Sequence, residues 1–253
     1  EETSIRAQKS QSDYEVYTAM EFRYQYNFKD SWSITALLNY SEAEVYYERI
    51  FFLDIFRPVS DTLISIRGFG DPMIILDRLL DLKTGKFTHQ FRPGIGVKFP
   101  LGNTEKKTDY DALLLPGSGS WDLLFRMNYQ LIYQDAGLSI LPNYRYNGRG
   151  AKAYTKGNTF NLTIEPFYIF RFSNDFAIIP HSGLYYEYSR QDIQEEEVID
   201  LSGGKLAFWQ IGLNLNYKQI TFINSFQNEI FQEPNGNQIL AKERINLGMI
   251  WNF

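Results

Sequence analysis

The chain has 253 residues, a formal net charge of −5, no cysteine, and aromatic residues at 17% of positions, including 18 Tyr and 20 Phe. The acidic balance argues against a nucleic-acid partner, and the lack of cysteine excludes disulfides, thiol nucleophiles and thiolate metal sites. No run of about 18 or more apolar residues occurs, so the sequence offers no transmembrane helix. A membrane-spanning β-strand escapes that test because its lipid-facing and inward-facing residues alternate.

Apolar and polar residues alternate along most of the chain, as in β-strands that have one apolar face. Between residues 121 and 133, Trp121, Phe125 and Tyr129 fall on one face, whereas Asp122 and Arg126 fall on the other. The pattern predicts about eleven strands, most of them longer than the about 9–11 residues that a tilted strand needs to cross a bilayer. The predicted strands are 13–28, 31–46, 69–82, 86–100, 119–134, 136–148, 157–172, 175–190, 204–217, 219–232 and 240–253.

Two local features depart from this pattern. Residues 69–82 alternate poorly, so a short helix competes with a strand in this segment. Several predicted strands contain proline, which lacks the N–H that a strand ladder needs, so we expect bulges or unpaired positions at Pro93, Pro142, Pro166 and Pro180.

The connections between the predicted strands alternate between short and long. The short ones carry turn residues and lie at 29–31, 84–86, 135–137, 173–175 and 218–219. The long ones are polar and span 47–68, 101–118, 149–156, 191–203 and 233–239. Short turns at one end and long loops at the other are typical of outer-membrane barrels. We therefore predict an all-β, transmembrane, antiparallel up-and-down barrel of about 12 strands, located in the bacterial outer membrane.

The direction of the last strand fixes the expected topology of the whole chain. If Phe253 lies at the periplasmic rim, counting back places Glu1 outside the cell. Because single-chain barrels of bacteria have an even number of strands, we expect one further strand before Glu1. Residues 1–12 are then an extracellular loop of a single domain that spans 1–253, and closure within these residues would contradict the count.

Three segments occur in an order that resembles a known family. They are "RGFGDPMIILDRLL" (67–80), "GIGVKFPLGNTE" (94–105) and "LLPGSGSWDLLFRMNYQLIYQDAGL" (114–138). They are similar to segments of the bacterial outer-membrane barrels known as transporters of the phenol-degradation meta-pathway type, and the sequence looks like members from the Bacteroidetes. The resemblance covers roughly residues 67–253 and implies a barrel fold and a transport role.

Charged residues gather on the face opposite the apolar one, which in a barrel points into the lumen. Both signs are present, so the sequence allows either a polar pathway for small solutes or a network of ion pairs that fills a narrow barrel. The residues predicted to line the lumen are Glu21, Arg23, Arg92, Lys98, Asp122, Arg126, Arg145, Glu165, Arg171, His181, Glu187 and Arg244.

Aromatic residues near strand ends predict girdles at the two membrane interfaces. The candidates are Trp32, Trp251 and Phe253 on the periplasmic side and Trp121 on the outer side. The apolar segment 49–56 within a long loop suggests an inward constriction or a contact with lipid or a partner.

Three short motifs have competing interpretations. The glycines of Gly68-Phe-Gly70-Asp71 favour a turn or bulge over a phosphate loop, because no helix follows. The acidic run 192–200 indicates a solvated loop more than a divalent-cation site. His181 and Ser182 are adjacent on a strand, so they point to opposite faces and do not form a hydrolytic pair.

The sequence therefore predicts a passive channel or transporter for small solutes, with a structural or partner-binding barrel in a larger assembly as the alternative. We expect no enzymatic activity, catalytic residue, cofactor or metal. The expected partners are outer-membrane lipid and lipopolysaccharide, the barrel-assembly machinery through the C-terminal strand, and envelope proteins, but no nucleic acid.

Overall fold

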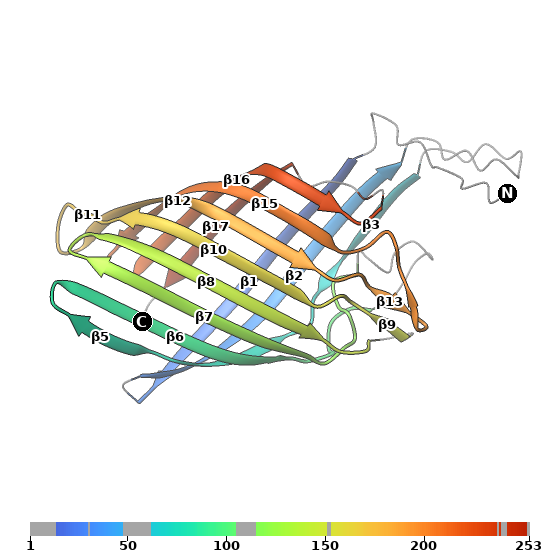
Figure 1. Cartoon of the computed structure of the whole chain (residues 1–253), viewed down its shortest axis with the longest axis horizontal. Helices are drawn as coiled ribbons and strands as arrows, with labels where there is room; N and C mark the ends of the chain where they lie inside the picture. The colour runs from blue at the N-terminus through green and yellow to red at the C-terminus, as the bar shows by residue number, and fades with distance from the viewer. Residues whose placement is uncertain are drawn as a thin grey trace, which may run out of the picture.

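The computed structural model describes residues 14–29, 31–47, 62–104, 115–150, 153–236, 238 and 242–251. Its main sheet is antiparallel and strongly curled (Figure 1). The expected loop 1–12, the apolar segment 49–56 and Phe253 lie outside the described residues. In the described part of the chain, no helix is long and apolar enough to cross a membrane.

The main path of the sheet contains eleven strands, which confirms the predicted all-β barrel class and strand number. Their order in space follows their order in the chain, as in an up-and-down barrel. The path comprises β1 (Tyr14–Phe28), β2 (Trp32–Tyr47), β4 (Met73–Arg78), β6 (Phe87–Lys98), β7 (Asp122–Tyr133), β8 (Ala136–Asn147), β10 (Thr159–Tyr168), β12 (Phe176–Ser189), β15 (Gly204–Tyr217), β16 (Ile220–Pro234) and β17 (Glu243–Trp251).

Of the predicted strands, 69–82 differs most from the structure. It begins earlier and is divided into β3 (Thr62–Phe69), β4 and β5 (Leu80–Thr84). β3 pairs with the second half of β2, β4 pairs with the first half of β2, and β5 pairs with β6. The break after Phe69 coincides with Gly70-Asp71-Pro72, where proline interrupts the ladder. The competing short helix is therefore wrong.

The strand pairing is interrupted beside all four strand prolines, as the sequence predicts. The ladder from β7 to β8 has no pair between Asn143 and Ile140, on either side of Pro142. The ladder from β10 to β12 skips from Ile164 to Phe167, across Pro166. Comparable gaps flank Pro93 and Pro180 on one side each. The missing N–H of each proline explains why pairing fails on that side.

The two ends of the sheet differ as the sequence predicts. Tight turns gather at one end, where Lys29, Gln134 and Lys218 adopt left-handed φ values of 54°, 54° and 53°. The longer connections gather at the other end (Figure 1), where β9 (Tyr154–Thr155), β13 (Ile193–Gln194) and β14 (Glu197–Val198) form a small separate sheet. β11 (Phe170–Arg171) extends the turn end beside β12.

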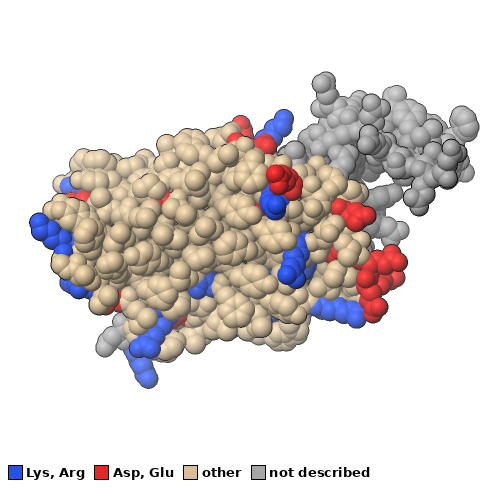
Figure 2. Space-filling model, viewed as in Figure 1, with Lys and Arg blue, Asp and Glu red and all other residues tan. Residues whose placement is uncertain are grey.

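The outer surface is apolar between two charged ends. Along β7, the outward-facing Leu123 and Phe125 are 42% and 45% exposed, whereas the inward-facing Asp122 is 1% exposed. Figure 2 shows the same pattern over the visible face, with few charged side chains between the two ends of the sheet. This exterior suits a lipid environment, and the concave side is called the inner face below.

The first and last strands of the path are free edges. Among the described residues, β1 pairs only with β2, and β17 pairs only with β16. Because the path has an odd number of antiparallel strands, β1 and β17 run in the same direction. A single additional strand between them would be antiparallel to both. The closing strand expected from the sequence stays a prediction.

Candidate functional site

The inner face brings most of the predicted lumen residues onto one concave wall. Glu21 and Arg23 lie on β1, on the side facing the buried Leu37 of β2, and form an exposed ion pair of 2.7 Å. Arg171 lies at the turn end instead, 3.1 Å from Asp135, with both side chains about half exposed. The remaining residues alternate with outward apolar residues on β6 to β17: Arg92, Lys98, Asp122, Arg126, Arg145, Glu165, His181, Glu187 and Arg244.

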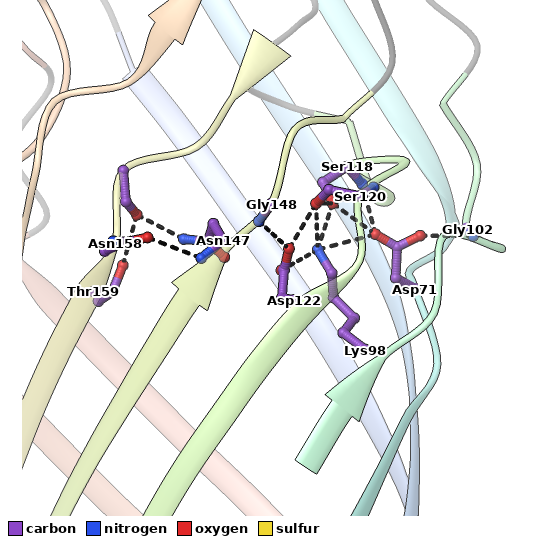
Figure 3. A network of polar contacts seen from close by, with 11 residues as sticks. Asp71, Lys98, Gly102, Ser118, Ser120, Asp122, Asn147, Gly148, Asn158 and Thr159 are labelled. Carbon is purple, nitrogen blue, oxygen red and sulfur yellow. Dashed lines mark hydrogen bonds and ion pairs between the residues drawn. The ribbon is translucent and has the colours of Figure 1, made fainter. Parts of the chain in front are cut away.

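A buried polar cluster lies at the loop end of β6 and β7 (Figure 3). The Lys98 ammonium lies 3.2 Å from Asp71 Oδ2 and 2.5 Å from Asp122 Oδ2. The hydroxyl of Ser118 donates to Asp71 at 2.9 Å, and that of Ser120 donates to Asp122 at 2.7 Å. Asp71, Lys98 and Asp122 together form a carboxylate–ammonium–carboxylate triad, called the rim triad below. Such a buried group is stable only because its charges and hydrogen-bonding atoms are satisfied together.

Backbone N–H groups complete the coordination of Asp71. Gly102 donates to its Oδ1, and Ser118 donates to its Oδ2, both at 2.8 Å. Burial alone would raise the pKa of Asp71. The hydrogen bonds from Ser118 and Gly102, together with the charge of Lys98, outweigh that effect and lower the pKa below its ordinary value. Asp71 is therefore ionised at neutral pH.

Glycines allow the three family-like motifs to meet around Asp71. A Cβ on Gly102 would lie 2.6 Å from the Asp71 nitrogen, and one on Gly117 would lie 2.7 Å from the Gly102 carbonyl carbon. Gly70 similarly lies against the carbonyl of Pro116. Neither Gly68 nor Gly70 has a positive φ. Close contact with the Asn103 side chain at Gly68, and with backbone carbonyls at Gly70, explains these glycines better than the expected turn or bulge conformation.

A second buried group fills the inner face between β2, β4 and β7. Arg126 donates to both carboxylate oxygens of Asp77, with its Nε 2.7 Å from Oδ1. A Cβ on Gly94 would lie 2.1 Å from Asp77 Oδ1, so this glycine makes room for the pair. Beside the pair, an apolar cluster comprises the buried Leu37, Met73 and Ile75 and the partly buried Leu124.

The inner face of β10, β12, β15 and β16 carries a connected chain of polar side chains. The Nδ1 atom of His181 lies 2.8 Å from Glu165 Oε1. Gln210 donates to the same oxygen at 2.5 Å, and Gln227 donates to Gln210 at 2.7 Å. Ser182 points away and donates to the backbone carbonyl of Gln210 instead. The adjacent histidine and serine therefore do not form a catalytic pair.

Arg244 of the last strand stacks on aromatic rings rather than pairing with a carboxylate. Its guanidinium carbon lies 4.4 Å from the ring centre of Phe208 and 5.7 Å from that of Tyr185. Phe208 is fully buried, and the hydroxyl of Tyr185 donates to Glu187. A cation over aromatic faces in a partly buried site is a stabilising arrangement.

The acidic run 192–200 does not behave as one solvated segment. Asp192 is 6% exposed, accepts a hydrogen bond from Gly157 N–H at 2.7 Å and accepts another from the Tyr154 hydroxyl. Burial and the Asp192 carboxylate raise the pKa of Tyr154 above its ordinary value. Glu195, Glu196 and Glu197 are exposed as expected. Asp192 thus supports the loop end, which the sequence interpretation missed.

The predicted aromatic girdles have distinct surroundings. Trp32 begins β2 at the turn end, with the Arg78 guanidinium 5.4 Å from its ring centre. Trp121 is 60% exposed near the loop end, and Trp251 is 61% exposed at the end of β17. The Nδ1 atom of His89 lies 2.9 Å from the hydroxyl of Tyr129.

The described residues contain no cluster of three or more His, Asp or Glu side chains with the arrangement of a metal site. The chemistry available on the inner face is therefore hydrogen bonding by amides and hydroxyls, together with charges held mostly in pairs. Long alternating strands, short turns at one end and an apolar exterior define an outer-membrane β-barrel protein.

Comparison with solved structures gives the same fold. The chain is similar to the COG4313 outer membrane channel from Pseudomonas putida F1, with a TM-score of 0.63 and 12% sequence identity over 92% of this chain and 81% of that chain. It also matches LpxR from Salmonella typhimurium, with a TM-score of 0.40 and 11% identity over 94% of this chain and 89% of that chain. No family model and no curated protein matches the sequence.

The expectation that the chain is not an enzyme requires correction. A barrel of this kind does not exclude enzymatic activity, because function depends on the site and not on the fold alone.

Proposed function

We propose that the chain is a passive outer-membrane channel or transporter for small solutes. The observation that carries this proposal is the contrast between the two faces of β6 to β17. The outer face is apolar, whereas the inner face presents amides such as Gln90, Asn128, Gln130 and Asn143. A polar inner face inside an apolar exterior is the arrangement of a barrel whose interior admits water.

The assignment to a particular family of transporters rests on the sequence motifs. The segments around Gly70, Gly102 and Gly117 resemble transporters of the phenol-degradation meta-pathway type, and the sequence looks like members from the Bacteroidetes. Their contact around Asp71 supports a common structural role for these motifs in this chain. We propose this family relation together with the transport role.

Single-channel recording in planar bilayers tests the proposal. We expect the purified, folded protein to produce discrete conductance steps. Gln90→Trp combined with Gln130→Trp should lower the conductance, because both residues lie on the inner face and are direct neighbours across β6 and β7. Phe125→Trp is the matched control, because its side chain faces outward. A folded protein that never conducts would overturn the channel proposal.

A structural or partner-binding barrel is the second candidate. The filled region formed by Leu37, Met73, Ile75 and the Asp77–Arg126 pair favours it, because these side chains occupy part of the interior. This candidate predicts no conductance from the pure protein and co-purification of envelope proteins after mild cross-linking.

The surroundings of the barrel follow from the same proposal. Outer-membrane lipid and lipopolysaccharide would cover the apolar exterior, and the barrel-assembly machinery would bind the alternating C-terminal strand during insertion. Envelope proteins would contact the long loops. Deletion of β17 should abolish membrane insertion in cells, as measured by heat-modifiable gel migration, and continued insertion would contradict the assembly assignment.

A further inference from the structure

Seven polar side chains of the inner face form one row across neighbouring strands, which follows the register of the sheet. The register pairs Gln90 with Gln130, Gln130 with Ser139, and Ser139 with Glu165. It also pairs Gln210 with Gln227, and Gln227 with Arg244. Gly183 of β12 connects the two halves, because it pairs with Gln210 and packs against Glu165. This amide belt comprises Gln90, Gln130, Ser139, Glu165, Gln210, Gln227 and Arg244.

One half of the amide belt is fixed by its own hydrogen bonds. Gln227 donates to Gln210, and Gln210 donates to Glu165, whose carboxylate also bonds His181. Ser139, Gln210 and Gln227 are buried. Because its members hold one another in place, this half is preorganised.

The other half has hydrogen-bonding capacity left over. Within the described residues, the amides of Gln90 and Gln130 make no side-chain hydrogen bond, and both remain partly exposed. Nearby, the buried Oδ1 atom of Asn128 also lacks a hydrogen-bond partner in this part of the chain. Buried polar groups without partners are costly, so these atoms suit water or a polar solute.

Charges on the inner face are largely neutralised in groups. Arg126 holds Asp77, Lys98 lies between Asp71 and Asp122, and Glu165 bonds His181. The inner-face charges without an ion pair among the described residues are of both signs: Asp81, Lys83, Arg92, Arg145, Arg244, Glu187 and Glu229. The wall therefore lacks a ring of one sign that would select ions of the other.

We propose that the amide belt binds uncharged solutes that carry several hydroxyl or amide groups. This inference rests on the proposed channel function. A glutamine amide both donates and accepts hydrogen bonds, and a hydroxyl group does the same. A solute with a net charge loses hydration at the belt without meeting an opposite charge in excess, which opposes its passage.

Liposome swelling with three molecules of similar size tests the inference. Glucose is uncharged, gluconate is an anion and glucosamine is a cation. Glucose should enter about fivefold faster than either charged molecule, roughly the effect of one lost hydrogen bond. In bilayers under a KCl gradient, the reversal potential should lie near zero, because no ion sign is preferred.

Variants on one strand assign the effect to the belt. Gln130→Leu combined with Gln90→Leu should remove most of the preference for glucose while the channel still conducts. Leu131→Met is the matched control, because residue 131 follows Gln130 and faces outward. Heat-modifiable migration of each variant checks that it is folded.

The outcomes separate the two proposals. A conducting protein with a strong preference for one ion sign, or with equal entry of glucose and gluconate, would overturn the amide-belt inference and leave the channel function intact. Unchanged glucose preference in the folded double variant would also overturn it. A folded protein with neither conductance nor swelling would overturn the channel function and this inference with it.

Discussion

Two parts of the inner wall have opposite character although they share one sheet and one apolar exterior. The inner face of β2 and β4, with part of β7, is filled by Leu37, Met73, Ile75 and the Asp77–Arg126 pair. The inner face from β8 to β16, together with Gln90 of β6 and Gln130 of β7, carries mainly amides and hydroxyls. Because alternation sets only which face a residue occupies, the choice between a filled and a hydrated wall depends on the inward residues alone.

The largest expected effect contrasts two positions on the same strand. Arg126→Met should reduce the free energy of unfolding by about 3–5 kcal/mol, because it leaves the buried Asp77 carboxylate without its partner. Gln130→Met, four residues along the same inner face, should change it by less than about 0.5 kcal/mol, because its amide lies on the hydrated wall. Urea unfolding in lipid vesicles, followed by tryptophan fluorescence, measures both values. Equal losses at the two positions would remove the distinction between the walls.

A smaller loss of stability is expected at Gly94, which leaves room for the buried Asp77–Arg126 pair. Gly94→Ala should cost about 1–3 kcal/mol, because the added methyl group meets Asp77 and forces the pair to move. Gly248→Ala is the control on β17, where the nearest atom to the added carbon is Ile223 Cβ at 3.8 Å. The same unfolding assay compares them. A tolerated Gly94→Ala would show that the filled wall has spare room.

Acidification should weaken the rim triad by protonating Asp71, without affecting the amides of the hydrated wall. The pKa of Asp71 is lowered in the folded protein, so its stabilising contribution is present above its ordinary pKa. It is lost only as pH falls below that value, through the lower folded pKa. Proteolysis of the described segment 115–121 should therefore stay slow from pH 7 to about pH 4 and increase below it. In Asp71→Asn the cleavage rate should not change with acid, after correction for the pH dependence of the protease. An acid-triggered increase of equal size in that variant would contradict this assignment.

The last prediction concerns the free edges and carries no expected change in stability. We propose that one antiparallel strand separates β1 from β17 in the closed barrel. Cysteine pairs placed along these edges, such as Phe22→Cys with Leu247→Cys, should then form no disulfide. Two strand spacings of about 4.8 Å exceed the roughly 7 Å limit between bridged Cα atoms.

The chain is suited to this test because it contains no cysteine of its own. Phe226→Cys with Ile245→Cys is the positive control, because these residues are register partners on β16 and β17. Oxidation followed by mass spectrometry identifies each bridge. A disulfide between β1 and β17 would show that the two edges pair directly.

Much of the fold is predictable from the sequence because a period of two is a local property. It is visible in residues 121–133 without knowledge of any partner strand, and it also assigns Asp122 and Arg126 to the inner face. Proline positions predict the ladder gaps for the same reason, since the missing N–H belongs to the residue itself. The division of residues 62–84 into three strands depends on neighbouring strands, which the local pattern does not contain.

The contacts within the site are harder to predict because their members are distant in sequence. Asp71 bonds Gly102 and Ser118, which lie 31 and 47 residues away. The acidic neighbours of Asp192 predict an exposed side chain, yet Asp192 is buried and its partner Gly157 lies 35 residues earlier. Likewise, Gln90 and Gln210 are ordinary polar residues in the alternation. Only the strand register places them in one belt.

The rim triad has a mechanical consequence for the loop end. Asp71 follows β3, Lys98 ends β6, and Asp122 begins β7 and accepts a hydrogen bond from Gly148 after β8. Force applied to any one of these connections is therefore carried to the same ammonium group. Displacement of any one of these anchored residues must either break its bond to Lys98 or Asp122 or move the others with it.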